Sequence, residues 1–157
     1  MGVEIEKKFL LAGEGWRGLD AGRLYRQGYL HSEKGRTVRV RTVAERGYLT
    51  IKGPATAGIR AEYEYEIPFA EAVEMLETLC LRPLIEKRRY RIGFKGFVWE
   101  IDEFFADNAG LVLAEIELPA PDQHFEKPPW IGEEVTDDPR YSNAALSRQP
   151  YRSWRRQ

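Results

Sequence analysis

The chain has 157 residues, of which 43% are hydrophobic and 31% charged, a composition typical of one globular domain and not of a disordered protein. Its 24 Lys and Arg residues nearly balance 25 Asp and Glu residues, which argues against a general nucleic-acid-binding protein, because such proteins usually carry a large basic excess. The single cysteine, Cys80, excludes an internal disulfide and a cysteine-rich zinc site, and without a long apolar run we expect no signal peptide, no membrane span and a cytoplasmic location.

Most of the chain alternates between apolar and polar residues with a period of two, which is typical of half-buried β-strands. The pattern predicts strands, in chain order, over residues 3–9, 23–31, 36–44, 48–52, 59–67, 86–94, 97–104 and 111–118. Glycine-containing turn signals such as Glu33-Lys34-Gly35 and Glu45-Arg46-Gly47 separate several of these segments. Such short connections favour antiparallel neighbours.

One segment changes to helical spacing. Apolar residues recur at three- and four-residue intervals over 69–80, between Pro68 and Pro83, and predict an amphipathic helix. A second, short helix is predicted over 138–147, and the basic, aromatic residues 148–157 are predicted to be a mobile tail. We therefore expect one domain over 1–157, with its core over about 2–147.

Many strands with few helices predict a mainly β (α+β) fold. An antiparallel sheet can lie open or close into a barrel, and closure removes the exposed edge strands. We expect an antiparallel β-barrel with a few flanking helices, and an open sheet is the alternative.

The charges fall on one face of the predicted strands. In the strand over 59–67, Glu62, Glu64 and Glu66 share a face opposite Tyr63 and Tyr65. The simple interpretation is a sheet with a solvated polar face, but such a face usually mixes neutral and charged residues. Here carboxylates gather on some strands and cations on others, so another interaction must compensate the repulsion between like charges within each group.

The alternative interpretation is a barrel with these charges in its lumen and an apolar outer face, covered by the helix over 69–80 and by the carboxy-terminal segment. Burying so many unpaired ions is costly, so the lumen would be wet or occupied. Clustered carboxylates suit hard divalent cations such as Mg²⁺ or Mn²⁺, and clustered Arg and Lys suit phosphate oxygens. The two together predict a site for a metal–polyphosphate complex.

These residues resemble a known family. Glu4-Ile5-Glu6-Lys7-Lys8 matches the ExExK signature of the CYTH superfamily, the triphosphate tunnel metalloenzymes. The resemblance continues in order from about residue 2 to residue 147, through Arg39-Val40-Arg41, Thr50-Ile51-Lys52-Gly53, Arg60-Ala61-Glu62-Tyr63-Glu64, Glu86-Lys87-Arg88-Arg89-Tyr90, Trp99-Glu100-Ile101-Asp102-Glu103-Phe104 and Ala114-Glu115-Ile116-Glu117-Leu118. It implies an eight-stranded antiparallel β-barrel that forms a charged tunnel.

The resemblance also implies roles for individual residues. The expected substrate-binding residues are all cationic: Lys8, Arg39, Arg41, Lys52, Arg60, Lys87 and Arg89. The expected metal ligands are all carboxylates: Glu4, Glu6, Glu62, Glu64, Asp102, Glu115 and Glu117. Of these residues, Lys87, Glu4 and Glu64 are expected to be catalytic, and Tyr29 either gates the tunnel or only packs.

The small bacterial members that this chain resembles are usually inorganic triphosphatases. We therefore expect hydrolysis of tripolyphosphate to pyrophosphate and phosphate, with Mg²⁺ or Mn²⁺, two ions per site, and either Lys87 or a metal-bound hydroxide as base. A thiamine triphosphatase or class IV adenylate cyclase is an alternative, and would need a pocket for an organic group. A non-catalytic polyphosphate-binding module and an ordinary β-sheet protein also remain open. The expected partner is a small polyanion, without nucleic acid or membrane, and the family is compatible with a homodimer.

Overall fold

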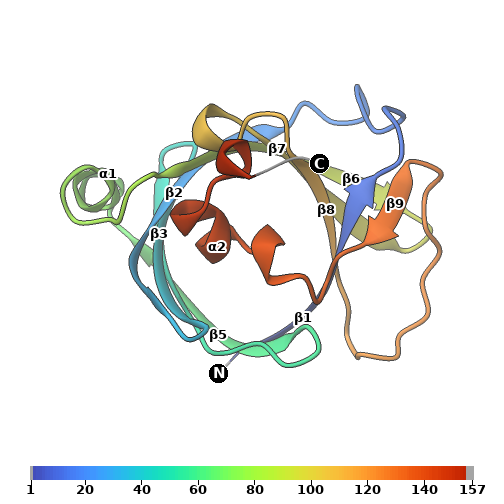
Figure 1. The fold of residues 1–157 in the computed structure, drawn as a ribbon, viewed down its shortest axis with the longest axis horizontal. Coiled ribbons are helices and arrows are strands. Elements are labelled where there is room, and N and C mark those ends of the chain that lie inside the picture. Colours follow the sequence, from blue (N-terminus) through green and yellow to red (C-terminus); the bar gives the residue numbers. More distant parts are fainter. Residues whose placement is uncertain (1, 155–157) are drawn as a thin grey trace.

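The fold is built on one antiparallel sheet, seen in a computed structural model that describes residues 2–154. Its strands are β1 (Gly2–Leu11), β2 (Arg23–Glu33), β3 (Arg36–Val43), β4 (Arg46–Lys52), β5 (Ile59–Ile67), β6 (Ile85–Phe94), β7 (Phe97–Phe104), β8 (Val112–Glu117) and β9 (Ile131–Glu134). They follow the order β5-β4-β3-β2-β6-β7-β8-β1-β9, and an additional pairing of β5 with β1 closes β1–β8 into a barrel (Figure 1). The predicted closed barrel is confirmed, and the open-sheet alternative is wrong.

The eight predicted strands all appear in the structure, and their ends differ from the prediction by at most two residues. β9 was not predicted, because four residues are too few to show a period of two. It pairs with the end of β1, Phe9 with Glu134 and Leu11 with Ile131. β5 pairs only with the first residues of β1, from Gly2 to Ile5, so β9 pairs with the part of this edge of β1 that β5 leaves free.

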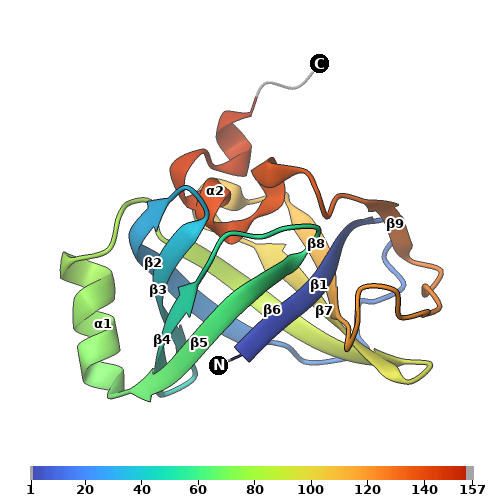
Figure 2. The same ribbon diagram turned by 90° about the horizontal axis from the view of Figure 1, so that it is seen from below.

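The predicted helix over 69–80 is confirmed as α1 (Phe69–Thr78), which lies on the outside of the barrel beside β3 and β4 (Figure 2). Ala72, Leu76 and Cys80 pack there against Val40 of the barrel wall. Gly47 of β4 is required at this contact, because a Cβ atom on it would lie 2.6 Å from the Cβ of Ala72.

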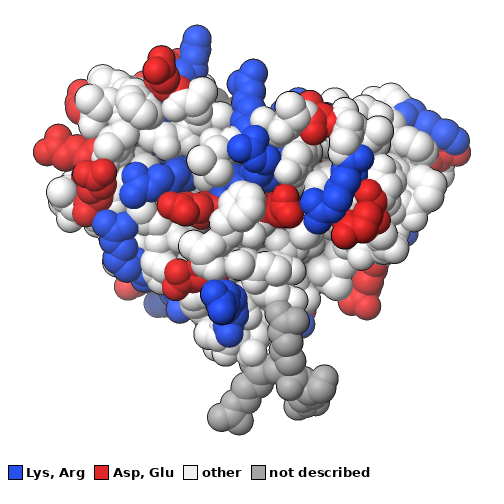
Figure 3. All heavy atoms as spheres, turned by 90° about the horizontal axis from the view of Figure 1, so that it is seen from above, with Lys and Arg blue, Asp and Glu red and all other residues white. Residues whose placement is uncertain are grey.

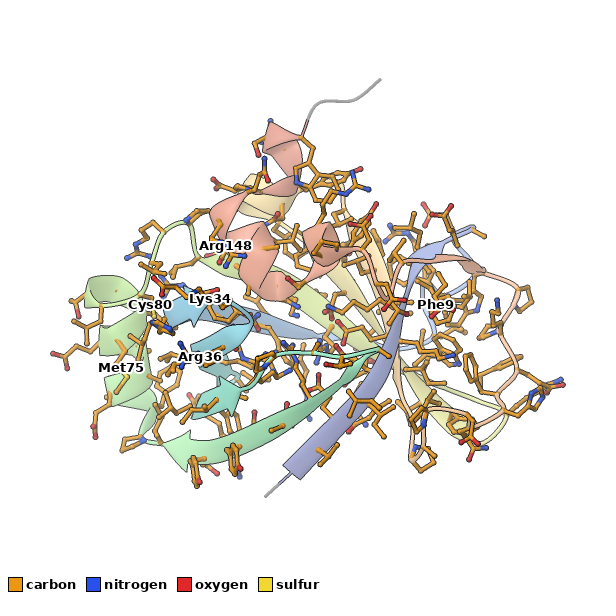
Figure 4. All side chains as sticks on the ribbon, turned by 60° about the horizontal axis from the view of Figure 1, so that its bottom comes forward. Phe9, Lys34, Arg36, Met75, Cys80 and Arg148 are labelled. Atoms are coloured by element: carbon orange, nitrogen blue, oxygen red, sulfur yellow. The ribbon has the colours of Figure 1, made fainter. Side chains whose placement is uncertain are left out.

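The opposite outer wall is covered by aromatic side chains from loops. Phe9 points out of the barrel and contacts Trp99 and Phe125, with ring centroids 5.5 and 6.2 Å away (Figure 4). Trp16 and Trp130 complete this cluster. The apolar outer face therefore exists as expected, but loops cover it on this side.

The carboxy-terminal segment lies across one mouth of the barrel (Figures 1 and 2). The expectation that this segment covers the outer wall is therefore wrong. The helix predicted over 138–147 is divided into η2 (Pro139–Tyr141) and α2 (Asn143–Arg148), and η3 (Tyr151–Ser153) follows. A further short helix, η1 (Ala106–Asn108), precedes β8. Within residues 2–154, no helix is long and apolar enough to cross a membrane.

This segment makes one end of the lumen apolar. Tyr141 and Leu146 join a buried cluster with the barrel residues Ile85, Phe104 and Leu113. The charged part of the lumen therefore ends here, where the segment packs against apolar residues of β6, β7 and β8.

The end of the segment folds back on itself. The ring of Trp154 lies 5.3 Å from that of Tyr141 and 5.0 Å from that of Tyr151. The mobility predicted for residues 148–157 stays a prediction, and its residues 155–157 lie outside the described part of the chain.

Candidate functional site

A cavity of about 160 Å³ occupies the lumen beside the apolar cluster. Nearly all of its lining side chains are charged: Glu4, Glu6, Lys8, Tyr29, Arg39, Arg41, Lys52, Arg60, Glu62, Glu64, Arg89, Glu100, Glu115, Glu117 and Asn143. On the outer face in Figure 3, by contrast, cations and carboxylates are interspersed among uncharged residues. The strands therefore direct their segregated charges into the lumen, as the alternation of charged and apolar residues along each strand predicts.

The inward-facing charges are sorted by strand. The strands β4, β3 and β6 carry what we name the basic arc: Lys52, Arg39, Arg41, Lys87 and Arg89. β2, which lies between β3 and β6, contributes none of these cations. The neighbouring strands β7, β8, β1 and β5 carry what we name the acidic arc: Glu100, Asp102, Glu115, Glu117, Glu4, Glu6, Glu62 and Glu64. Two cations, Lys8 and Arg60, lie among the carboxylates of the acidic arc.

Asp102 joins the two arcs. It accepts hydrogen bonds from Arg89 Nε at 2.7 Å, from Arg89 Nη2 at 2.9 Å and from Lys87 Nζ at 2.7 Å. Burial alone would raise the pKa of Asp102, but the adjacent Arg89 and Lys87 hold it below its usual range. Both carboxylate oxygens are thus engaged by cations, which fits a role in holding the basic arc together.

Lys87 is fully buried beside Asp102. Removal from water disfavours its ammonium form and lowers the pKa of Lys87 to about 7, although the Asp102 carboxylate opposes this effect. The structure describes every residue that the resemblance assigns to the site, and all of them except Lys87 and Asp102 line the cavity.

Neutral side chains hold the two arginines of β3 that line the lumen. Arg39 Nη2 donates to Thr50 Oγ1 at 3.2 Å, and Thr50 Oγ1 donates to Glu64 Oε1 at 2.8 Å. Arg41 Nε donates to Gln27 Oε1 at 2.9 Å. Burial and the neighbouring guanidiniums of Arg39 and Arg89 lower the pKa of Arg41, which shows how strongly positive this part of the lumen is.

Three uncharged site residues, Thr50, Gln27 and Asn143, are not indicated by the charge pattern of the sequence. Gln27 and Thr50 share the inward phase of their strands, so the alternation could have found them. Asn143 lies on α2, whose position over the mouth has no signal in the strand pattern.

The acidic arc is less completely paired. Glu4 Oε2 accepts from Lys52 Nζ at 2.7 Å, and although burial would raise the pKa of Glu4, the Lys52 charge holds it below its usual range. The other oxygen, Glu4 Oε1, is buried and accepts no hydrogen bond from any described residue; Arg60 Nε lies 3.7 Å away.

Glu6 is the carboxyl of the acidic arc that is hardest to ionise. Burial and the nearby Glu115 carboxylate raise the pKa of Glu6 to about 8. Lys8 Nζ lies 3.9 Å from both Glu6 and Glu115, too far for a hydrogen bond. Burial and like charges also raise the pKa values of Glu62 and Glu117.

These carboxylates fit a divalent cation by their chemistry. Carboxylate oxygens are the donors that Mg²⁺ and Mn²⁺ prefer, and an unpartnered buried oxygen on Glu4 together with a protonated Glu6 indicates missing positive charge. In the described part of the chain, no three His, Cys, Asp or Glu side chains are already gathered as a metal site. The ligands therefore surround the lumen without converging on one point.

A second cavity, of about 390 Å³, leads into the lumen beside α2. It lies between the tip of the β2–β3 hairpin, residues 55–58 and residues 136–148, and it shares Glu4, Glu6, Lys8 and Arg60 with the lumen cavity. Arg148 Nη1 donates to Ser32 Oγ at 2.5 Å, which ties α2 to the hairpin (Figure 4).

Comparison with known proteins agrees with this architecture. A family model described as the CYTH domain matches residues 2–149. The chain is 55% identical over 155 residues to the inorganic triphosphatase of Acetivibrio thermocellus, which covers 99% of both proteins. It is 38% identical over 149 residues to the inorganic triphosphatase of Nitrosomonas europaea, covering 92% and 97%. A crystal structure described as an inorganic triphosphatase matches with a TM-score of 0.67 and 35% identity, over 91% of this chain and 96% of that one.

Proposed function

The chain belongs to the CYTH domain family, and from this premise we propose that it is a metal-dependent inorganic triphosphatase. Its reaction would hydrolyse tripolyphosphate to pyrophosphate and phosphate. The observation that carries the proposal is a lumen cavity in which a basic arc faces an acidic arc. The two similar proteins named inorganic triphosphatase support it.

The basic arc supplies the groups that bind the phosphates. Arg39, Arg41 and Arg89 present guanidinium groups, whose paired N–H groups match phosphate oxygens. Lys52, Lys8 and Arg60 extend this positive surface toward β1 and β5. A linear chain of phosphates would be oriented along the arc, and its charge would be spread over several cations.

The acidic arc supplies the ligands for two divalent cations, Mg²⁺ or Mn²⁺. The ligands we propose are the carboxylates that line the cavity: Glu4, Glu6, Glu62, Glu64, Glu115 and Glu117. When bound, such cations neutralise phosphate charge and acidify a coordinated water molecule. Asp102, which the resemblance groups with these ligands, instead orients Arg89 and Lys87 through its hydrogen bonds.

Lys87 is the residue we propose as general base. With its pKa lowered to about 7, a large fraction of Lys87 holds a neutral amine near neutral pH. The water oxygen attacks the terminal phosphorus, the bond from that phosphorus to the bridging oxygen breaks, pyrophosphate leaves, and the water proton passes to the amine. Asn143, to which Lys87 Nζ donates at 3.1 Å, lines the cavity and places Lys87 directly behind it.

Phosphate release from three substrates tests the proposal. We expect tripolyphosphate to be hydrolysed much faster than ATP or thiamine triphosphate, with Mg²⁺ or Mn²⁺ present, and excess EDTA to stop the reaction. Faster turnover of ATP or thiamine triphosphate would assign the lumen to an organic triphosphate. Binding of tripolyphosphate without phosphate release would indicate a binding module, and full activity in EDTA would contradict the metal dependence.

A further inference from the structure

Arg41 is held in the lumen by uncharged groups. Among residues 2–154, no carboxylate lies within 4.0 Å of its guanidinium. Its Nε donates to Gln27 Oε1 at 2.9 Å, and its guanidinium lies 4.9 Å from the centre of the Tyr25 ring. A partly buried arginine without an ion pair is costly, so this arrangement needs an explanation.

Gln27 is one end of a bridge of two amides. It is fully buried, and its Nε2 donates to Asn143 Oδ1 at 3.2 Å. The same Asn143 oxygen accepts from Lys87 Nζ at 3.1 Å. The bridge thus fixes Arg41 of β3 and Lys87 of β6 relative to each other, across β2, and fastens both to α2.

The bridge differs from the support of Arg89, which rests on the Asp102 carboxylate. A carboxylate in place of either amide could accept the same hydrogen bonds, but it would also cancel one positive charge of the basic arc. An amide oxygen orients a cation and leaves its charge available to a ligand.

We propose that Gln27 and Asn143 form a neutral bridge that positions Arg41 for the bound phosphates and Lys87 for the attacking water, and that their neutrality preserves the positive field of the basic arc. Gln27 lies behind the cavity lining and acts through Arg41, so it is a positioning residue. This inference rests on the proposed function, because its ligand is the tripolyphosphate chain.

A pair of substitutions at Gln27 separates orientation from charge. Gln27→Glu keeps the acceptor for Arg41, loses the N–H that donates to Asn143 and adds a negative charge, so we expect the KM for tripolyphosphate to rise at least about tenfold, with a smaller fall in kcat. Gln27→Met removes the acceptor at similar volume, so we expect kcat to fall at least about tenfold with a smaller change in KM.

Asn143 offers an independent repeat of the same comparison. We expect Asn143→Asp to raise the KM as Gln27→Glu does and also to lower kcat at neutral pH, because a carboxylate beside Lys87 raises the pKa of the proposed base. We expect Asn143→Leu to follow Gln27→Met. Gln123→Glu, in the loop between β8 and β9, makes the same change of charge away from the lumen and should leave KM and kcat unchanged. Melting temperatures are measured for every variant, and kinetics are compared below the lowest of them.

The outcomes distinguish this inference from the proposed function. Wild-type protein that releases no phosphate from tripolyphosphate would overturn the proposed function and the inference with it. Active wild type with a KM unchanged in Gln27→Glu, or a kcat unchanged in Gln27→Met, would overturn the inference alone. Variants that only melt at lower temperature, with unchanged kinetics, would show that the bridge is structural.

Discussion

The basic and acidic arcs face each other across one lumen, but they differ in how many of their charged groups have hydrogen-bond or ion-pair partners within the protein. Arg89, Arg39 and Arg41 each donate to a defined acceptor on Asp102, Thr50 or Gln27. In the acidic arc, one oxygen of Glu4 accepts no hydrogen bond from the described residues, and Glu6 holds its proton to a pKa of about 8. The basic arc is thus preorganised, and the acidic arc lacks positive charge that metal ions would supply.

Removing a charge from the acidic arc should have the largest effect. We expect Glu4→Gln to lower kcat about a thousandfold, because the arc would lose a carboxylate ligand of the proposed metal ions. Far-ultraviolet circular dichroism should show a folded barrel, since Lys52 can still donate to the amide oxygen. Glu66→Gln is a matched control, because Glu66 lies on β5 but is exposed and pairs with Arg46. A fully active Glu4→Gln variant would show that the acidic arc is not part of the reaction.

Lys87→Arg tests whether the basic arc supplies more than charge. Arginine keeps a positive charge but cannot lose its proton, so we expect kcat to fall about a hundredfold at neutral pH. The KM should change little, because Arg39, Arg41 and Arg89 remain. A melting temperature near that of the wild type would exclude misfolding as the cause. A variant with wild-type kcat would exclude Lys87 as the base.

The pH dependence of stability tests directly whether the acidic arc lacks positive charge, through the ionisation of Glu6, and its expected effect is smaller. The pKa of Glu6 is raised from 4.5 to about 8 on folding, so the folded, metal-free protein binds the proton more tightly than the unfolded chain. Stability contributed by this proton is present below about pH 4.5 and is lost as pH rises toward about 8.

Urea unfolding of wild type and Glu6→Gln between pH 5 and pH 8 isolates this effect. The glutamine cannot ionise, so we expect the wild type to lose a few kcal/mol of unfolding free energy relative to the variant as pH rises. A constant difference between the two proteins would mean that Glu6 is ionised throughout, and that the acidic arc is already satisfied.

The sequence predicted the strands and the inward face of the charges, because side-chain alternation is a local property of each strand. It also predicted which strands carry carboxylates, and strand order then sorts these into the arcs. It could not predict that Asp102 engages Lys87 and Arg89, since this depends on register between β6 and β7.

The apolar end of the lumen shows the same limit. Tyr141 and Leu146 lie far along the chain from the strands they contact, and nothing in the alternation of those strands indicates a segment crossing the mouth. Asn143 was missed for the same reason. Gln27 has the inward phase of β2, but its side chain is neutral, so a pattern of charges does not indicate it.

A crystal structure with Mn²⁺ and a non-hydrolysable tripolyphosphate analogue tests the central claim most directly. We predict anomalous scattering from Mn²⁺ within coordination distance of Glu4 and Glu6, and phosphate oxygens in contact with Arg39, Arg41 and Arg89. Phosphates bound outside the barrel, or Mn²⁺ bound away from the acidic arc, would contradict the division of labour between the two arcs.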